Sequence, residues 1–419
     1  MMSEVTLDAV TSDPLAMGWM QGSPPPPGHR ILAAEAGHMR FPMTRWSFSN
    51  MRQFCPTVRV GNHGGRAAPF ARALRDDLDG VMVTPIGGAP MTFAETLLAN
   101  FTDGILVLHK GAVVYERWFG VTGPEPRHIA FSMTKSFVGT VAEMLIEEGV
   151  LDPAAPIGGL IPELAGSGFA HATLRQVLDM TTAIDFAEDY TDPNSGIGAF
   201  SNALGLTPRP AGYTGATNML EFLPKIAKAG PGAGTHGDLF TYRTANTEVL
   251  GWVLARATGK PVHQLLTERL WSPLGMAGDA DMLVDSAGTA FAGGGLCLRL
   301  EDLARFGEAI RLGGRNAAGE QVIAAAAIAR ICDGGDPERF AHATYPALAG
   351  ASYRSQWWIT HNAHAAIAAR GIHGQTLWID PAADMVVARF ASHPIAANSG
   401  NDPHSLPAWA ALADHLARD

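Results

Sequence analysis

A serine and a lysine near the end of the first third of the chain have types and spacing that could support nucleophilic chemistry. Ser132 and Lys135 stand three residues apart, and an apolar run follows them to Val150. The spacing of the apolar residues over 138–150 predicts a helix, which would place the hydroxyl and the amine on one face. A serine at a helix start is more often a cap for backbone N–H groups. The spacing alone therefore leaves a nucleophile and a cap as alternatives.

Two features favour the nucleophile. The chain has five lysines, and Lys135 alone has a serine three residues before it. Its neighbours Ser136, Phe137 and Val138 lead into the apolar helix, so we expect the amine in a partly buried place that lowers its pKa. An amine that is neutral at working pH can accept the proton of a nearby hydroxyl.

The composition limits the classes of partner and compartment. The 419 residues carry a formal net charge of −10, which argues against binding to nucleic acid or to an anionic membrane. No apolar stretch approaches the ~20 residues of a membrane span. Three scattered cysteines form no disulfide framework, and Met1 to Ala16 lacks the basic and apolar regions of a secretory signal. We expect a cytoplasmic protein that acts on a small molecule. A homodimer is among the arrangements that the sequence allows.

The order of the expected elements indicates how the pair is positioned. Residues 105–108 and 112–118 form a predicted hairpin before the helix, and short strands are predicted at 355–360, 365–369, 377–380 and 385–390. Helices are predicted at 173–180, 218–229, 247–258, 300–312 and 407–417, a long loop at 184–213 and a connection at 272–281. The fold class is therefore α/β (α+β), with an antiparallel sheet flanked by helices. We expect a sheet domain from 1–150 and 282–419, with 1–95 as an irregular wrap, and a mainly helical inserted domain at 151–281.

Two further stretches, 239–251 with Tyr242 and 371–381 with Gly371-Ile372-His373, follow Ser132-Met133-Thr134-Lys135 in order. With them the chain resembles the serine β-lactamase-related hydrolases, which include the penicillin-binding proteins. It is most similar to the 6-aminohexanoate-dimer hydrolases of nylon-oligomer degradation and their carboxylesterase relatives. The resemblance spans roughly residues 100 to 395 and implies a β-lactamase/transpeptidase-like fold.

The resemblance also implies roles for single residues. It makes Ser132 the acylated nucleophile, Lys135 its proton acceptor and Tyr242 the phenol that passes a proton to the leaving group. The backbone N–H groups of Ser132 and Ile372 would form the oxyanion hole. Four further residues are expected at the substrate: Tyr190, Trp358, Gly293 and His373. For His373 a supporting hydrogen bond remains an alternative, and of Trp357 and Trp358 one should lie in the core and the other face the cleft.

Departures from the family pattern keep the substrate open. Thr244 stands where many relatives have asparagine, Ala369 replaces the lysine of Lys-Thr-Gly, and Gly293 replaces a polar residue of the amide hydrolases. A small linear amide and a short-chain ester are both compatible with the motifs, and a non-catalytic ligand-binding member of the fold is a third reading. We expect no cofactor and no metal, since no third ligand or acidic neighbour accompanies His361 and His364.

Overall fold

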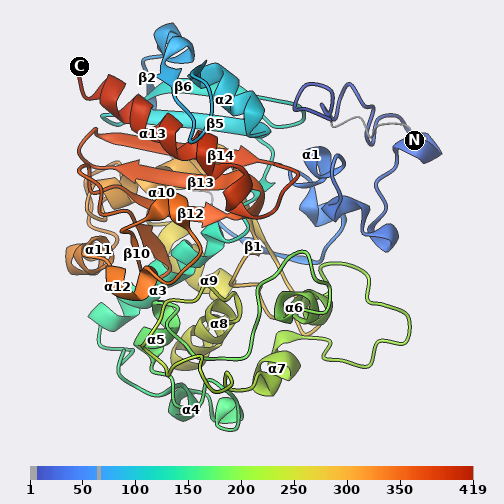
Figure 1. Ribbon diagram of the computed structural model, residues 1–419, viewed down its shortest axis with the longest axis vertical. Helices are drawn as coiled ribbons and strands as arrows, with labels where there is room; N and C mark the ends of the chain where they lie inside the picture. The colour runs from blue at the N-terminus through green and yellow to red at the C-terminus, as the bar shows by residue number, and fades with distance from the viewer. Residues whose placement is uncertain (1–6, 64–67, 419) are drawn as a thin grey trace.

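An eight-stranded sheet lies at the centre of the computed structural model, which describes residues 7–63 and 68–418 (Figure 1). Its strands run in the order β10-β11-β12-β13-β14-β5-β6-β2. Neighbouring strands are antiparallel except for β2 and β6, which are parallel. The bounds are β2 Ala71–Arg72, β5 Thr102–His109, β6 Ala112–Trp118, β10 Ser352–Arg354, β11 Trp357–Ile359, β12 Ile367–Gly371, β13 Gln375–Asp380 and β14 Met385–Ala391. The predicted hairpin and the predicted C-terminal strands are thus confirmed as neighbours in one sheet.

Helices cover both faces of this sheet. Helix α10 (Leu300–Arg311) packs on β13, β14 and β5, and α3 (Met133–Glu147) packs on the same side against β12. On the other face lie α2 (Phe93–Ala99) and α13 (Asp402–Leu416), and Figure 1 shows α13 beside β14. Because both faces are covered, β5 is buried along its whole length and reads as a continuous apolar run in its second half.

A group of helices lies beyond one end of the sheet, green to yellow in Figure 1. It contains α4 Ile157–Leu160, α5 Leu174–Leu178, α6 Gly196–Leu204, α7 Met219–Phe222, α8 Ala245–Thr258 and α9 Val262–Leu266. The division into a sheet domain and an inserted domain stays a prediction. Its expected boundary between 281 and 282 falls inside strand β8 (Ala280–Leu283).

Two local predictions in this region are wrong. The expected loop 184–213 contains α6, which Ser195 caps by accepting the Gly198 N–H and which Gly205 ends in a left-handed conformation. Serine at an N-cap and glycine after a C-terminus are common helix boundary residues, so the sequence contained the signals for this helix. The helix expected at 218–229 gives way after Phe222 to a 3₁₀ turn containing Pro224, whose ring prevents a continuous helix. Residues 239–243 have no regular secondary structure.

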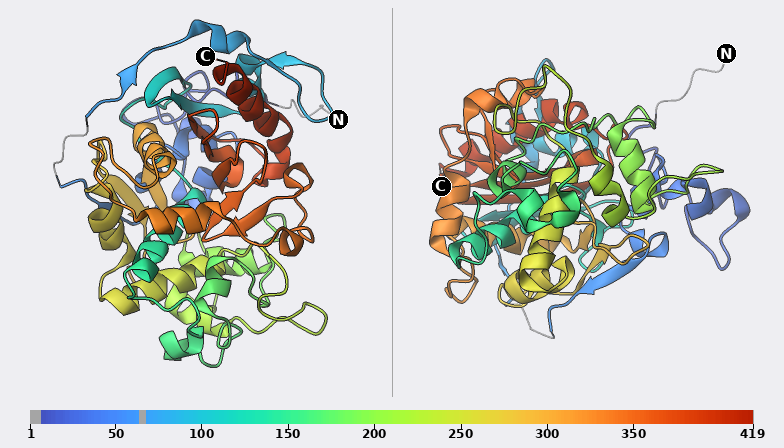
Figure 2. Two further views of the ribbon diagram at one scale, coloured as in Figure 1. Left: turned by 90° about the vertical axis from the view of Figure 1, so that its left-hand side faces the viewer. Right: turned by 90° about the horizontal axis from the view of Figure 1, so that it is seen from below.

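A second, four-stranded sheet joins the N-terminal segment to the centre of the molecule. Its order is β1-β8-β9-β7, with β1 Thr57–Val60, β7 His128–Ile129 and β9 Leu296–Leu298. The N-terminal segment is largely irregular as predicted, but it contributes β1 and the short helix α1 (Thr44–Ser47), and β8 occupies the end of the expected connection 272–281. Figure 2 shows the blue segment on one side of the molecule. Strand β7 leads directly toward Ser132, and β9 directly follows the glycines at 293–295.

The remaining elements are short. They are the hairpin β3 Met82–Val83 and β4 Met91–Thr92, and the helices α11 Ala325–Cys332 and α12 Pro337–Phe340. Across the described ranges, none of the helices combines the length and apolar character that crossing a bilayer requires.

Candidate active site

Ser132 and Lys135 are brought together at the N-terminus of α3. The Lys135 Nζ lies 2.8 Å from the Ser132 Oγ and donates a second hydrogen bond to the Gly293 carbonyl oxygen at 2.6 Å. Ser132 occupies the cap position of α3, but its hydroxyl makes no capping hydrogen bond to the helix. The cap alternative is thereby excluded for this side chain, and the hydroxyl is engaged with the lysine.

The surroundings of Lys135 favour its neutral form. The residue is 1% exposed, and its two hydrogen-bond partners are uncharged. Burial lowers the pKa of the amine to about 8, against the attraction of the Glu188 and Glu248 carboxylates, which raises it. The expected lowering is confirmed in direction, and the amine is more completely buried than the sequence suggested. An amine with this pKa is partly unprotonated at neutral pH and can act as a base.

The residue before the serine has an unusual backbone conformation. Phe131 has a φ of +44°, the left-handed region that bulky residues rarely adopt. Its ring packs edge to face on Phe48, with centroids 4.9 Å apart, and tilted against His373 at 5.6 Å. Such a conformation costs on the order of 1–3 kcal/mol and persists where the surroundings enforce it. The turn that presents Ser132 is therefore held by the aromatic packing beneath it.

Tyr242 reaches the same hydroxyl from the helical side. Its phenol is hydrogen-bonded to Ser132, and its ring centroid lies 5.2 Å from the Lys135 Nζ. Burial, followed by the negative charge of Glu188, raises the pKa of this phenol above its ordinary value, although the Ser132 hydrogen bond opposes the shift. The phenol therefore keeps its proton at neutral pH. Three of the residues expected at the site thus meet within hydrogen-bonding reach of one hydroxyl.

Strand β12 ends against the turn that carries Ser132. A Cβ atom on Gly371 would lie 2.6 Å from the Ala130 carbonyl oxygen, so only glycine permits this approach. The strand stops at Gly371 and a short turn begins at Ile372. Within the described part of the chain, no backbone acceptor takes the N–H of either Ser132 or Ile372. Two such N–H groups at adjoining turns are the kind of donors that stabilise an oxyanion.

His373 lies in this turn with a φ of +61° and is largely buried. Its Nδ1 is 2.7 Å from the His393 carbonyl oxygen, and its ring packs against Phe48 and Phe131. Burial lowers its pKa to about 4, so the ring is neutral at neutral pH and Nδ1 carries the proton that the carbonyl accepts. These contacts match the supporting alternative, and a direct contact of His373 with substrate stays a prediction.

Tyr190 is connected to the Ser132 cluster through Glu188. The Tyr190 hydroxyl donates to the Glu188 carboxylate at 2.6 Å, and the same carboxylate accepts the N–H and hydroxyl of Thr244 at 2.6 and 2.9 Å. Thr244 follows Tyr242 by two residues. Tyr190 is 41% exposed, so its ring is available at the surface beside the cluster, and its contact with substrate stays a prediction.

The indole ring of Trp358 packs against the ring of Tyr242. The two rings stack with centroids 5.5 Å apart, and the Arg370 guanidinium lies 5.1 Å from the indole centroid. Trp357 packs on the opposite face of the sheet against Phe306. The two tryptophans alternate as predicted, but both are buried, so the expectation that one is exposed to the cleft is wrong. A substrate contact for Trp358 stays a prediction.

The turn at Gly293 leaves no room for a side chain. A Cβ atom there would lie 2.6 Å from Thr244 Cγ2 and 2.9 Å from Glu248 Oε1. The Gly293 N–H donates to that Glu248 oxygen at 2.6 Å, while its carbonyl holds Lys135. The sequence reasoning missed Glu248, because an acidic residue in a predicted helix is ordinarily on the solvent side. Gly293 therefore contacts the lysine through its backbone.

The two histidines that were rejected as metal ligands, His361 and His364, have separate hydrogen-bond partners. His364 Nδ1 lies 3.0 Å from an Asp380 oxygen, and His361 Nε2 lies 2.7 Å from the Ser352 hydroxyl. The statement that no acidic neighbour accompanies them is wrong for His364, because β13 brings Asp380 close in space. Among residues 7–63 and 68–418, no cluster of three or more His, Cys, Asp or Glu side chains could hold a metal ion.

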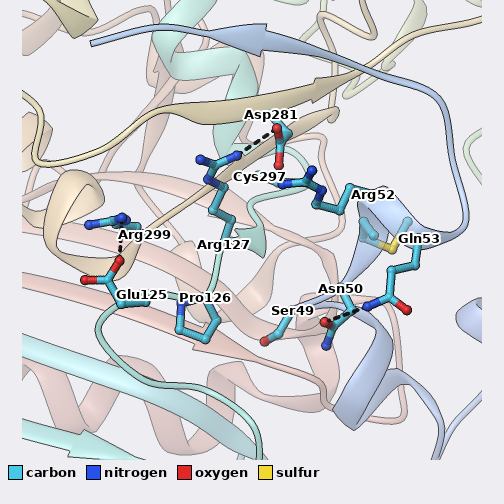
Figure 3. A pocket seen from close by; sticks show the side chains of 11 residues that line it. Ser49, Asn50, Arg52, Gln53, Glu125, Pro126, Arg127, Asp281, Cys297 and Arg299 are labelled. Carbon is cyan, nitrogen blue, oxygen red and sulfur yellow. Dashed lines mark hydrogen bonds and ion pairs between the residues drawn. The ribbon is translucent and has the colours of Figure 1, made fainter. Parts of the chain in front are cut away.

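A surface cavity of about 390 Å³ lies elsewhere, at the four-stranded sheet (Figure 3). Four of its charged groups form two ion pairs: Arg127 with Asp281 at 2.8 Å, and Arg299 with Glu125 at 2.5 Å. None of the lining residues belongs to the Ser132 cluster. The size of this cavity is therefore a poorer guide to chemistry than the geometry around Ser132.

Comparisons with known proteins indicate the family of the chain. The beta-lactamase family pattern matches residues 95–403. The 6-aminohexanoate-dimer hydrolase of Paenarthrobacter ureafaciens is 35% identical over 354 residues, which cover 84% of this chain and 86% of that protein.

Solved structures extend the comparison. A protein from Bacillus anthracis, provisionally assigned as a 6-aminohexanoate-dimer hydrolase, matches with a TM-score of 0.82 at 30% identity over 91% of this chain and 96% of its own. A hydrolase with promiscuous acyltransferase activity matches with a TM-score of 0.56 at 16% identity, over 76% of this chain and 98% of its own. The second likeness concerns the fold alone.

Proposed function

The chain belongs to the beta-lactamase family and has the β-lactamase/transpeptidase-like fold, and on this premise we propose that it is a serine hydrolase acting through an acyl-enzyme. The proposed substrate is a small linear amide of the 6-aminohexanoate-oligomer type. In the first half-reaction the Ser132 Oγ attacks the substrate carbonyl carbon and the leaving amine departs. Water then releases the acid from Ser132 in the second half-reaction.

Proton transfer in this proposal uses the two groups that contact the Ser132 hydroxyl. The neutral Lys135 amine takes the Ser132 proton as the Oγ–C bond forms. The Tyr242 phenol, which the raised pKa keeps protonated, gives its proton to the leaving nitrogen and is reprotonated from Lys135. Without this donation an amine would have to leave as an amide anion, which is a far poorer leaving group.

The backbone N–H groups of Ser132 and Ile372 are proposed to stabilise the oxyanion. The proposal is supported by the close approach of Gly371 to Ala130, which brings the end of β12 to the serine turn. The N-terminus of α3 adds its dipole in the same place. One donor of this kind is worth about 3 kcal/mol of transition-state stabilisation in acyl-transfer enzymes.

One observation carries the proposal: a buried lysine amine with a lowered pKa lies 2.8 Å from a serine hydroxyl that caps nothing. A structural serine would satisfy a helix N–H, and a structural lysine would extend its amine to water or to a carboxylate. Neither is the case here. The arrangement is the one that a hydroxyl nucleophile and its base require.

A short-chain carboxylesterase is the second candidate function, and Gly293 favours it. The amide hydrolases that the sequence resembles carry a polar side chain at this position, and here Thr244 and Glu248 occupy its space. An ester needs less assistance, because an alkoxide leaves more readily than an amide anion. The same Ser132, Lys135 and Tyr242 would serve both substrates.

Parallel assays of 6-aminohexanoate linear dimer and p-nitrophenyl butyrate separate the two candidates. Release of 6-aminohexanoate by wild type and not by Ser132→Ala supports the amidase. Turnover of the ester alone supports the esterase. If the enzyme turns over neither compound, both substrate assignments fail.

A non-catalytic ligand-binding role is tested by labelling. A fluorophosphonate probe should add one phosphonyl group to wild type, detected by intact mass, and none to Ser132→Ala. Unlabelled wild type, or equal labelling of both proteins, would favour the ligand-binding role.

A further inference from the structure

A second buried ionisable group lies beside the Ser132 and Lys135 pair. Glu248 is on α8 and is almost completely buried. Its carboxylate accepts the Gly293 N–H at 2.6 Å and also a hydrogen bond from the Ala292 backbone. The turn formed by residues 292–294 is therefore attached to α8 through this one side chain.

The same turn is attached to the lysine on its other side. The Gly293 carbonyl oxygen is 2.6 Å from the Lys135 Nζ, so the N–H of Gly293 binds Glu248 while its C=O binds Lys135. A neutral amine that donates one N–H to this carbonyl can direct its lone pair toward the Ser132 Oγ at 2.8 Å. The position of Gly293 thus decides whether the amine is aligned to accept the serine proton.

Glu248 also interacts with Lys135 through its charge. Its carboxylate raises the pKa of Lys135, and the lysine in turn lowers that of Glu248. Burial raises the pKa of the acid, and the hydrogen bonds from the Gly293 and Ala292 backbones and the charge of Lys135 oppose that shift and favour the carboxylate. The other charged group that acts on the lysine is Glu188, from the segment before Tyr190. Lys135 and Glu248 therefore each favour the charged form of the other across the Gly293 turn.

We infer that Glu248 is a positioning residue for the proposed nucleophile: its carboxylate holds the Gly293 turn against Lys135, and its charge sets the readiness of the amine to take the Ser132 proton. This inference rests on the proposed function. When the Ser132 O–H bond breaks, the proton passes to the Lys135 Nζ and creates an ammonium. The Glu248 carboxylate, on the other side of the Gly293 turn, favours that ammonium through its charge.

The test is the rate of fluorophosphonate labelling of Ser132 as a function of pH, in the full-length protein. This reaction forms the Oγ–P bond, breaks the P–F bond, releases fluoride and transfers the serine proton to Lys135. It needs no knowledge of the natural substrate. In wild type the labelling rate should rise through the pKa of Lys135 to a plateau.

The deciding variant is Glu248→Gln, which keeps an acceptor for the Gly293 N–H and removes the charge. Its labelling profile should move to lower pH by about one unit, because the ammonium loses its counter-charge, while the plateau changes by less than about threefold. Glu248→Ala loses the acceptor as well, so its plateau should fall by about tenfold or more. A profile for Glu248→Gln that coincides with wild type overturns the inference.

Glu308→Gln is the matched control. Glu308 is also a largely buried helical carboxylate, but it pairs with Arg311 on α10. Its removal should leave the labelling profile unchanged, and an equal shift in this variant would make the Glu248 effect non-specific and overturn the inference. Thermal melting of each variant checks the fold.

If Glu248→Gln does not fold, Gly293→Ala tests the same contact from the other side. The added Cβ would meet Glu248 Oε1 at 2.9 Å and Thr244 Cγ2 at 2.6 Å, which should displace the turn and lower the plateau at least tenfold. An unchanged plateau overturns the inference. Failure of the proposed function is distinguishable, because wild type itself would then remain unlabelled.

Discussion

The two ends of helix α3 each bury an ionisable side chain, with opposite results. Near its start, Lys135 is 1% exposed and is held only by the Ser132 hydroxyl and the Gly293 carbonyl. Eight residues further on, Glu143 is fully buried, and its carboxylate accepts hydrogen bonds from the guanidinium groups of Arg175 at 2.6 Å and Arg330 at 2.9 Å. Burial lowers the pKa of the lysine to about 8, which favours its neutral form. Burial alone would raise the pKa of Glu143, but its partners lower it, which favours the charged form.

The difference teaches what makes a buried charge reactive. Burial disfavours the charged form of both groups, and direct opposite charges and hydrogen bonds to the charged form oppose that penalty. Glu143 has two guanidinium groups and the Ser355 hydroxyl, so it stays ionised and joins α3 to its neighbours. Lys135 has neutral partners in contact and carboxylates only beyond them, so it can exchange a proton. The same helix therefore carries a stabilising group and a reactive group.

The comparison predicts first that loss of the reactive group abolishes activity and spares stability. Ser132→Ala and Lys135→Met should each lower kcat/KM on the order of 10⁴-fold or more, since members of a catalytic unit fail together. Lys135→Met should unfold at no lower urea concentration than wild type at pH 7. The lowered pKa of Lys135 means that its ammonium is less stable in the folded state than in the unfolded state. Marked destabilisation by Lys135→Met would make this lysine structural.

The uncharged contacts around Ser132 and Lys135 can be tested with Tyr242→Phe. The change removes the hydroxyl that binds Ser132 and keeps the ring beside Lys135. The kcat should fall on the order of 10²- to 10³-fold, as expected for loss of a general acid. Amides should suffer more than p-nitrophenyl esters, whose leaving group needs no proton. Equal losses for both substrate types would contradict the role given to the phenol.

For Glu143 the comparison predicts the reverse: its loss lowers stability and spares activity. Glu143→Ala leaves Arg175 and Arg330 without their shared carboxylate, and breaking a buried ion pair in this way costs about 3 kcal/mol of unfolding free energy. Urea denaturation measures the loss. The surviving folded enzyme should keep kcat within a few-fold of wild type at low temperature. Arg330→Ala is the milder control, because Arg330 is partly exposed and Arg175 would still pair with Glu143.

The smallest expected effect is on pH dependence, and it separates the two ends without a mutation. Lys135 must be unprotonated to act, so kcat/KM should fall about tenfold per pH unit below its pKa of about 8. The Glu143 contribution to stability is present above the ordinary pKa of a glutamate and is lost only as the pH falls through its lowered value. Between pH 6 and 8, activity should therefore change through Lys135 while the Glu143 contribution to stability stays constant. A flat activity profile across this range would remove Lys135 as the base.

The sequence predicted the parts of the site that depend on local spacing. Ser132 and Lys135 share a helix face, so their contact follows from helical geometry, and Tyr242 and Ile372 followed from motif order in the family resemblance. Glu248 and Glu188 escaped, because their roles depend on contacts with Gly293 and Thr244 that arise only when separate segments pack together. Propensity and periodicity carry no information about such long-range contacts.

The fold shows the same division. Long, strongly patterned elements such as β5, α3 and α8 were predicted well, whereas α6 and the break after Phe222 were missed inside a polar, glycine-rich region. The burial of Glu143 could have been predicted from the sequence. It is the only charged residue between Lys135 and Glu147, within an otherwise apolar or small-residue helix. A lone acid in such a run must find a cation, and the chain has far more arginines than lysines to supply one.

The packing of Phe48 beneath the turn that carries Ser132 sets a lower limit on how far the chain can be shortened. Phe48 contacts Phe131 and His373, and its carbonyl accepts the Ile129 N–H. The family pattern begins only at residue 95, so a protein trimmed to the matched span 95–403 would keep Ser132, Lys135 and Tyr242 but lose the ring that props up the turn. A shortened chain, or a transfer of the proposed site to another scaffold, therefore has to include the segment around Phe48 together with the three motifs.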